Sequence, residues 1–232
     1  MKAIKTLSQG LNAILFPSFC QCCGDIQIED GRLLCPFCIE HLFEDANPRR
    51  LESCTEVFLP ECIRFQDALW KYDKFGYLQE LLIKLKYHGM AKLGEQLGTL
   101  LGFHLMNNPA FHDNEAYILA PVPLHSSRKR KRGYNQALDI AKGVSEVTKI
   151  PVIDDHALSR IKNTRTQTGL NLNKRMLNIK EAFRVNKPEA LARRTPIVVD
   201  DVFTTGTTTF GLAATLKPHS NQKMGIITVA LA

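Results

Sequence analysis

The spacing of leucines in the middle of the chain predicts two amphipathic helices. The first covers residues 76–86, and its apolar face carries Leu78, Leu81, Leu82 and Leu85. After Gly89, which ends this helix, the same period returns at Leu93, Leu97, Leu100 and Leu101. The junction, residues 84–89, is interpreted either as a solvated helix end or as part of a functional site.

The N-terminal part of the chain lacks such a period. Residues 1–16 combine two lysines with a short apolar patch and predict a short amphipathic helix. Residues 44–66 hold prolines and charges and predict a linker, with a strand pair near residues 56–70. We therefore predict a small N-terminal unit over residues 1–66, made of a helix, a cysteine module and the linker, and a larger domain over residues 67–232.

Short apolar runs in the larger domain predict buried strands at residues 117–122, 156–161 and 197–199. The first runs through prolines towards a helix that ends near residue 147, and the last runs through a turn into another helix. A buried strand that passes through a turn into a helix is typical of a parallel α/β sheet. Such sheets bind ligands at the carboxyl edge of their strands.

Residues suited to a phosphorylated sugar follow the strand at residues 197–199. Asp200 and Asp201 come first, and the turn after them contains Thr204, Thr205, Gly206, Thr207 and Thr208. Backbone N–H groups and hydroxyls at a helix start can bind a phosphate, and adjacent carboxylates can hold ribose hydroxyls or magnesium. The alternative is a buried strand followed by an ordinary polar helix cap. The order of strand, acids, hydroxyl-rich turn and helix favours the phosphosugar site.

Charge is distributed unevenly along the chain. The formal net charge of the 232 residues is +7, but residues 1–115 contain 11 Lys and Arg against 15 Asp and Glu, whereas residues 116–232 contain 19 against 8. The basic half would attract a polyanion, whether a pyrophosphate-bearing sugar or a nucleic acid. No apolar run approaches the roughly 18 residues of a membrane helix. We therefore expect no membrane insertion and a cytoplasmic location.

A run of five bases follows the strand at residues 117–122 and the turn residues Pro123 and Leu124, and we interpret it as a basic loop. It consists of Arg128, Lys129, Arg130, Lys131 and Arg132. Its place after a strand puts it at the same sheet edge as the threonine turn, where guanidinium groups can neutralise a leaving pyrophosphate. The alternative is a solvated surface or a nucleic-acid patch.

A second basic connection, residues 160–184, is longer than a loop that only joins two elements. We interpret it as a lid over a phosphate-rich ligand or as a DNA contact, with the alternative of a charged surface segment. Its candidate residues are Lys162, Arg165, Lys174 and Arg175. Binding to single-stranded DNA would also need aromatic stacking, for which Tyr134 and Phe183 are the nearest candidates.

The cysteines form two matching pairs, Cys20-x2-Cys23 and Cys35-x2-Cys38, separated by eleven residues. Two such knuckles predict a tetrahedral structural zinc site with four thiolates. Cys22 could replace Cys23, although only Cys23 gives the two-residue spacing, and His41 could replace a thiolate. Cys54 and Cys62 stand outside the pattern, as remnants of a second site or as buried thiols.

Taken together, these motifs resemble those of one known family. They are the cysteine pairs, Leu85-Lys86-Tyr87, Pro121–Leu124, Arg132–Gln136, Leu158–Arg160, Thr164–Gln167, Arg175–Phe183 and Val199–Thr208. Residues 197–209 resemble the signature of type I phosphoribosyltransferases, which bind 5-phosphoribosyl 1-pyrophosphate (PRPP). The order of all the motifs resembles the ComF family of bacterial phosphoribosyltransferase-like proteins, which includes GntX-like members.

This resemblance implies a type I phosphoribosyltransferase-like sheet with an N-terminal zinc ribbon, and PRPP bound with magnesium. Asp200 and Asp201 would hold the ribose, residues 204–208 its 5′-phosphate, and Pro123, Leu124 and Arg132 the pyrophosphate. Arg165 would join the two aspartates as a catalytic residue. The resemblance also implies a role in natural transformation, acting in the cytoplasm on incoming single-stranded DNA, with competence proteins such as a helicase or a strand-processing factor as partners.

One departure from the resemblance bears on the substrate. Purine-salvage enzymes commonly carry an acid just before the Thr-Gly pair of the phosphate loop, where this chain has Thr204, so purine salvage is disfavoured. The motif defines the phosphoribosyl donor and leaves the acceptor and turnover open. The alternatives are a metabolic phosphoribosyltransferase with a small-molecule acceptor and no DNA role, and a DNA-binding module on an inherited scaffold.

Overall fold

The computed structural model describes residues 18–28, 31–46, 59–109, 111, 116–162, 182–220 and 222–232. The predicted helix at residues 1–16 and Cys54 lie outside these residues. Most of the predicted lid, including Arg165, Lys174 and Arg175, also lies outside them.

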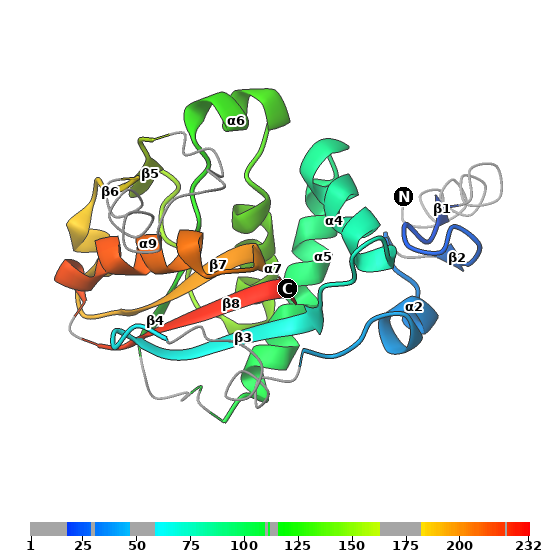
Figure 1. Cartoon of the computed structure of the whole chain (residues 1–232), viewed down its shortest axis with the longest axis horizontal. Coiled ribbons are helices and arrows are strands. Elements are labelled where there is room, and N and C mark those ends of the chain that lie inside the picture. The colour runs from blue at the N-terminus through cyan, green and yellow to red at the C-terminus, as the bar shows by residue number, and fades with distance from the viewer. Residues whose placement is uncertain are drawn as a thin grey trace, which may run out of the picture.

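Figure 1 shows the arrangement of the helices and strands. In chain order they are β1 (Ser18–Phe19), β2 (Gln27–Ile28), α2 (Pro36–His41), β3 (Ile63–Lys71), α4 (Tyr77–Tyr87), α5 (Ala91–Met106), β4 (Tyr117–Pro121), α6 (Ser126–Arg132), α7 (Gln136–Thr148), β5 (Leu158–Arg160), β6 (Phe183–Val185), β7 (Thr195–Phe203), α9 (Thr207–Leu216) and β8 (Met224–Leu231). Short 3₁₀ turns cover Pro188–Leu191 and Lys217–His219. The two leucine-rich helices are α4 and α5, and the three predicted strands are β4, β5 and β7.

The central sheet has the strand order β3-β8-β7-β4, and every neighbouring pair is parallel. Val152 adds a parallel bridge to Leu119 on the outer side of β4. The α/β class with a parallel sheet flanked by helices is therefore confirmed. The predicted strand pair near residues 56–70 is wrong for the described part, because β3 pairs with β8 instead of with its own neighbours in sequence.

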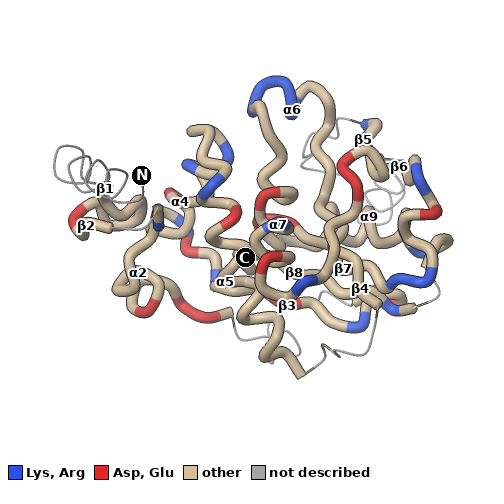
Figure 2. The backbone as a smooth tube through the Cα atoms, turned by 180° about the vertical axis from the view of Figure 1, so that it is seen from behind, with Lys and Arg blue, Asp and Glu red and all other residues tan. Residues whose placement is uncertain are grey.

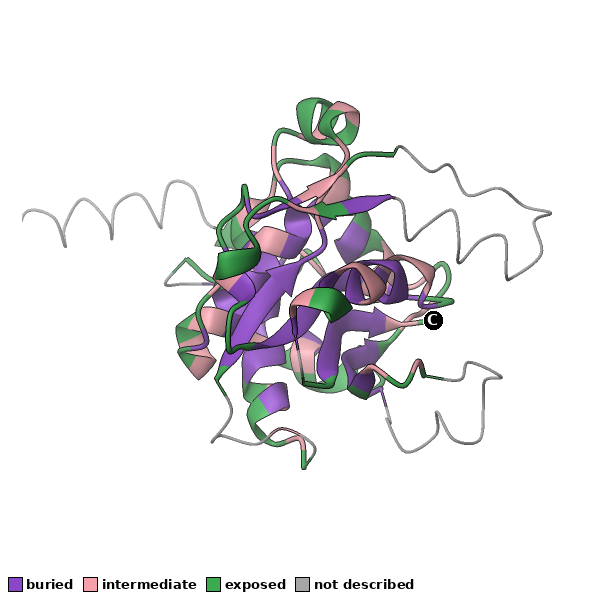
Figure 3. Cartoon of the chain, turned by 90° about the vertical axis from the view of Figure 1, so that its left-hand side faces the viewer, coloured by how far each residue is buried: buried purple, intermediate pink, exposed green. Residues whose placement is uncertain are grey.

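Two apolar layers bury the two faces of the sheet. Ile197 and Val199 of β7 pack into a cluster with α4, α5 and α7, whereas Val198 packs into a second cluster with α9 and the β5–β6 hairpin. Side chains alternate between the faces of a strand, so a run in which every residue is apolar serves both layers. Figure 3 shows the strands as the most deeply buried part of the chain.

Helices α5 and α7 pack so closely that glycine is required at the contact. A Cβ atom on Gly98 would lie 2.0 Å from the carbonyl oxygen of Ile140, and one on Gly143 would lie 1.9 Å from that of Glu95. Both neighbours are backbone atoms that cannot rotate away. The small residues therefore set the distance between these helices, and with it the position of α7 against the sheet.

The N-terminal module consists of the β1–β2 hairpin and α2, and it is docked on α4 and α5. Lys84 Nζ donates a hydrogen bond to the Gln21 carbonyl at 2.6 Å, and the Leu33 N–H donates to Gln96 Oε1 at 2.7 Å. The chain after α2 then lies along the free edge of β3, where Asp45 forms an antiparallel bridge to Trp70. This segment covers an edge that would otherwise expose unpaired backbone groups.

Candidate functional site

The strand connections place the candidate site between β4 and β7. The chain leaves β4 through α6 and α7 to reach Val152 on one side, and it leaves β7 through α9 to reach β8 on the other side. Two adjacent parallel strands whose connections run in opposite directions form a topological switch point, where open α/β sheets bind ligands. Pro121 lies opposite Val199, so the segments after both strands meet at this edge.

Asp200 and Asp201 belong to the last part of β7, which continues to Phe203. They are buried, with 9% and 5% of their surface exposed. Consecutive strand residues face opposite sides of a sheet. Asp201 accordingly meets α4, and Lys86 Nζ lies 3.1 Å from its Oδ2. At this distance the two charged groups form an ion pair. Their geometry is not that of a hydrogen bond, since Asp201 Oδ2 has no hydrogen bond among the described residues.

The environment of Asp200 disfavours its charged form. Burial and the negative charge of Asp201 raise its pKa to about 7, against weaker opposing effects of the Asp201 backbone N–H, Lys86 and Arg160. Arg160 ends β5, and burial lowers the pKa of its guanidinium, while the charge of Asp200 raises it. Near neutral pH the Asp200 carboxyl is therefore close to half-protonated, while the neighbouring carboxylate group lies beside the ammonium of Lys86.

The threonine turn forms the start of a helix, as predicted. Gly206 is the N-cap of α9 with φ of 68°, and a Cβ there would lie 2.3 Å from the Phe210 ring. The Thr205 and Thr207 hydroxyls share a hydrogen bond, and Thr209 Oγ1 donates to the Gly206 carbonyl at 3.1 Å. Gly206 offers no side chain to the first N–H groups of α9, and such N–H groups can bind an anion.

Four consecutive residues at the end of α4 contact three other parts of the chain. Lys84 binds the N-terminal module, and the Leu85 carbonyl accepts a hydrogen bond from the Tyr134 hydroxyl. Lys86 pairs with Asp201, and the Arg132 guanidinium lies 5.4 Å from the centre of the Tyr87 ring. Residues 84–87 therefore join three separate parts of the chain. Lys86 itself was not among the predicted site residues.

The run of five bases is a helix, which corrects the prediction of a basic loop. His125 caps α6 by accepting a hydrogen bond from the Ser127 N–H, and Gly133 ends it in a left-handed conformation. No residue of α6 is buried. Figure 2 shows α6 as a basic projection beyond the sheet. Pro123 and Leu124, both half-buried, connect it to β4.

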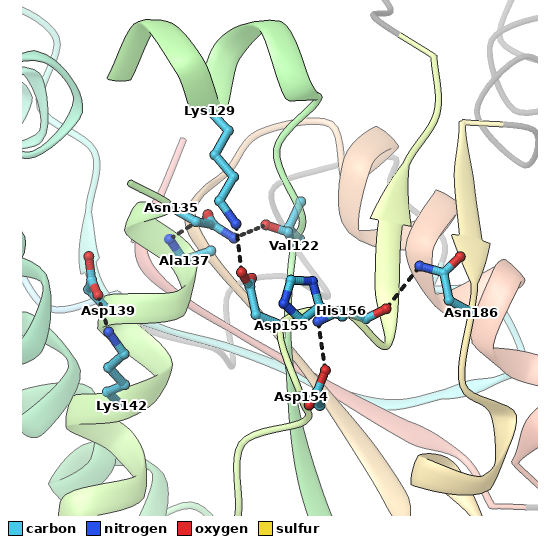
Figure 4. Close-up of polar contacts among 10 residues, drawn as sticks. All are labelled: Val122, Lys129, Asn135, Ala137, Asp139, Lys142, Asp154, Asp155, His156 and Asn186. Carbon is cyan, nitrogen blue, oxygen red and sulfur yellow. Dashed lines mark hydrogen bonds and ion pairs between the residues drawn. The ribbon is translucent and has the colours of Figure 1, made fainter. Parts of the chain in front are cut away.

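Single contacts tie the helix α6 to its surroundings. Lys129 Nζ lies 2.6 Å from Asp155 Oδ2 (Figure 4). Arg132 donates to Gln136 Oε1 at the start of α7. Asn135, between the helices, donates to the Val122 carbonyl at 3.1 Å and accepts from the Ala137 N–H (Figure 4). These contacts hold the backbone on both sides of α6, while Arg128, Arg130 and Lys131 remain exposed.

Neither aromatic residue predicted to stack on DNA presents an open ring. Tyr134 is half-buried and bonded to Leu85, and Phe183 is 4% exposed and covered by Arg160. Tyr87, which sequence reasoning did not select, is 65% exposed beside Arg132. Lys162 is exposed just after β5, and the β5–β6 hairpin adjoins the α6 cap through a bridge between Arg160 and His125.

The cysteine cluster matches the predicted ligand set. The Sγ atoms of Cys20, Cys23, Cys35 and Cys38 lie within 4.8 Å of one another, and Cys22 is not part of the group. The N–H groups of Cys22, Cys35 and Cys38 point at cluster sulfurs at 3.3–3.4 Å, a donor pattern that suits thiolates. The cluster can therefore hold a metal ion, and it fits a zinc ribbon.

The residues outside this cluster do not complete it. The His41 ring packs at a tilt against the Phe37 ring with ring centres 4.8 Å apart, and the His41 side chain is 58% exposed. Cys62 lies just before β3, and its carbonyl accepts a hydrogen bond from the Met224 N–H. Four cysteines leave no open coordination position, which is typical of a structural metal site.

Comparison with known proteins decides the family. Competence protein F of Haemophilus influenzae is 34% identical over 180 residues, which is 74% of this chain and 77% of that protein. The chain belongs to the ComF family. DNA utilization protein YhgH of Escherichia coli is 35% identical over 142 residues, 60% of each chain, and its counterpart in Salmonella typhimurium is 33% identical over 98 residues, 42% of each. No protein-family model matches the chain.

Membership of the ComF family agrees with the arrangement of the described residues. The cysteine module, the segment between α6 and α7 and the end of β7 are separate in sequence, and the end of α4 contacts each of them. Among the described residues, no helix has the length and apolar character needed to cross a membrane.

Proposed function

We propose that this ComF-family chain acts in natural transformation, where it handles incoming single-stranded DNA in the cytoplasm, and that it binds PRPP at the switch point between β4 and β7. The observation that carries the proposal is the meeting of two buried aspartates, an uncapped helix start and a basic segment at this edge. The names of the relatives, a competence protein and a DNA utilization protein, support the DNA role.

In this proposal each part of PRPP has its own partner. Asp200 and Asp201 hold the ribose hydroxyls, and residues 204–208 hold the 5′-phosphate. Pro123 and Leu124 shape the turn for the pyrophosphate, which Arg132 neutralises, and Arg165 closes over the ligand. Magnesium accompanies PRPP and shields its charge. The chemistry that this donor supports is displacement of pyrophosphate at the anomeric carbon, through an oxocarbenium-like transition state stabilised by the fixed charges.

The cysteine cluster is proposed to hold zinc as a structural ion. The β1–β2 hairpin and α2 bury little apolar surface, so the metal would supply much of the folding energy of this module. The module in turn supports α4 through the contact between Lys84 and the Gln21 carbonyl.

The DNA surface is proposed to run along α6 and end at Tyr87. Arg128, Arg130 and Lys131 can contact phosphates, and the exposed Tyr87 ring can stack on a base. Lys162, Lys174 and Arg175 would extend this surface, and Lys129 would join it if it leaves Asp155. Tyr87 now takes the role first given to Tyr134 and Phe183. Binding through phosphates should weaken steeply as salt rises.

The first experiment measures PRPP binding by calorimetry. The double substitution Asp200→Ala with Asp201→Ala should abolish binding and leave the protein folded. The matched control changes Asp154 and Asp155, an adjacent pair of surface acids, to alanine and should retain binding. Unchanged binding in the Asp200 and Asp201 variant would rule out the assigned site.

The second experiment separates the DNA role from the metabolic alternative. The protein is incubated with PRPP and magnesium, and pyrophosphate release is followed with and without single-stranded DNA. Release or PRPP affinity that changes with DNA supports the proposal. Release that requires a small-molecule acceptor and ignores DNA supports a metabolic phosphoribosyltransferase instead.

A further inference from the structure

The carboxylate of Asp201 is paired with Lys86, a lysine that was not among the predicted site residues. The side chain of Asp201 is 7% exposed and that of Lys86 is 26% exposed, and their charged atoms are 3.1 Å apart. Asp201 Oδ2 has no hydrogen bond among the described residues. Lys86 is therefore the direct compensation for this negative charge.

This ion pair competes with the proposed use of Asp201. A carboxylate that holds ribose hydroxyls must turn its lone pairs to them, and the ammonium of Lys86 stands beside the same oxygen. A buried carboxylate or ammonium left without a partner is strongly unfavourable. The buried Asp201 carboxylate must therefore find a new partner when ligand enters. PRPP offers partners to both groups: hydroxyls for the carboxylate and phosphate oxygens for the half-buried ammonium of Lys86.

The surroundings of Lys86 restrain its backbone and leave its side chain as the movable part. The residue before it accepts the Tyr134 hydrogen bond at its carbonyl, and the residue after it lies against Arg132. Lysine carries its charge on a flexible four-carbon stem, so the ammonium can reach a second position without movement of the helix. Arg132 lies on the side where the pyrophosphate is proposed to bind.

We propose that Lys86 is a ligand-binding residue that pairs with Asp201 when no ligand is bound and transfers to a phosphate oxygen of the phosphoribosyl ligand. This inference rests on the proposed PRPP site. It also means that Lys86 occupies the place beside Asp201 that a divalent cation would take. Removal of the ammonium should expose that place to a cation.

The first test compares PRPP affinities by calorimetry. Lys86→Gln should weaken binding by about tenfold or more, because a charge-assisted contact with phosphate is lost. Lys86→Arg should recover most of the affinity, because a guanidinium can also pair with phosphate. Lys92→Gln changes an exposed lysine on α5 and should bind like the unmodified protein. Equal PRPP affinity in the Lys86→Gln and unmodified proteins would overturn the inference.

The second test does not depend on PRPP. Manganese binding is followed by electron paramagnetic resonance in the unmodified protein, in Lys86→Gln and in Lys86→Gln combined with Asp201→Asn. Lys86→Gln should bind manganese about tenfold more tightly than the unmodified protein, and Asp201→Asn should remove the gain. No gain in Lys86→Gln would show that Lys86 does not hold the cation position.

The two tests separate the possible failures. If the unmodified protein does not bind PRPP, the proposed function fails, while the manganese gain still reports on the pairing of Lys86 with Asp201. If PRPP binds and Lys86→Gln binds it equally well, only the inference about Lys86 fails. A thermal unfolding curve of each variant checks that the fold is retained.

Discussion

The cysteine module and the carboxyl edge of the sheet differ in how far apart their polar groups lie in sequence and in whether those groups stabilise one another. Cys20 and Cys38 are 18 residues apart, and local turns bring all four cysteines together. At the sheet edge, Lys86 and Asp201 come from distant segments and meet only through the parallel sheet. In the module, the groups support one another, since backbone N–H groups donate to the sulfurs. At the edge, Asp200 and Asp201 oppose each other's charge.

Under the proposed function, this difference follows because one region serves the fold and the other serves a ligand. Groups that are arranged for a ligand often cost stability in its absence, so changes at the edge should stabilise the protein where changes in the module destabilise it.

The largest effect is expected from loss of a metal ligand. Cys38→Ser should remove the bound metal and unfold the module, because the cluster supplies most of its folding energy. Cys22→Ser is the matched control, since this thiol lies in the same knuckle outside the cluster. Metal content by mass spectrometry and limited proteolysis of the module report the result. Metal loss in both variants would show that Cys22 is also a ligand.

A large effect on stability is also expected from changes at the contact of α5 with α7. Gly98→Ala or Gly143→Ala should lower the free energy of unfolding by about 3 kcal/mol, because the added Cβ meets backbone atoms. Gly102→Ala should cost less, since its nearest neighbours would lie 3.2 Å away. Urea denaturation measures the differences, and equal costs at Gly98 and Gly102 would contradict the close approach.

A smaller effect of opposite sign is expected at the sheet edge. The folded pKa of Asp200, about 7, lies above the ordinary value, so the folded state binds this proton more tightly than the unfolded state. Its contribution to stability is greatest below pH about 4 and is lost as the pH rises through about 7. Asp200→Asn should therefore be more stable than the unmodified protein at pH 8, by on the order of 1 kcal/mol.

Chemical denaturation at pH 5 and pH 8 measures this effect. The advantage of Asp200→Asn should grow between the two values, whereas the exposed pair of Asp155 and Lys129 should give no such growth in Asp155→Asn. Parallel curves for Asp200→Asn and the unmodified protein would mean that the Asp200 carboxyl is not held near neutral pH in the folded state.

The smallest effect is expected at His104, away from the edge. Its Nε2 lies 3.0 Å from the buried carboxylate of Asp67, and this hydrogen bond raises the pKa of His104. The stability from this pair is fully present below pH about 6.5 and is lost as the pH rises through the raised value. His104→Gln should flatten this part of the pH profile, and His88→Gln, at an exposed position, should not.

The sequence could predict what depends on local spacing. The four cysteine ligands follow from two knuckles of fixed spacing, and the helix start at Thr207 follows from a glycine and hydroxyls after a strand. The aspartates were recognised because acids interrupt an apolar run. In each case the residues that matter lie within a few positions of one another.

The sequence could not predict what depends on tertiary contact. Lys86 appears as one of several lysines at a helix end, and only the packing of α4 against the sheet selects it for Asp201. The helix α6 was expected as a loop because prolines precede it and five charges fill it. Its cap at His125 and its end at Gly133 make it a helix, and arginine and lysine are good helix formers.

The two polar contacts described above between the module and the helices use main-chain groups of the module: the Gln21 carbonyl and the Leu33 N–H. Neither contact depends on the identity of the side chain at that position. Phe19, Ile26 and Phe37 of the module are exposed, so substitutions there should preserve both contacts. These exposed positions can therefore diverge to suit a new binding partner while the module stays attached to α4.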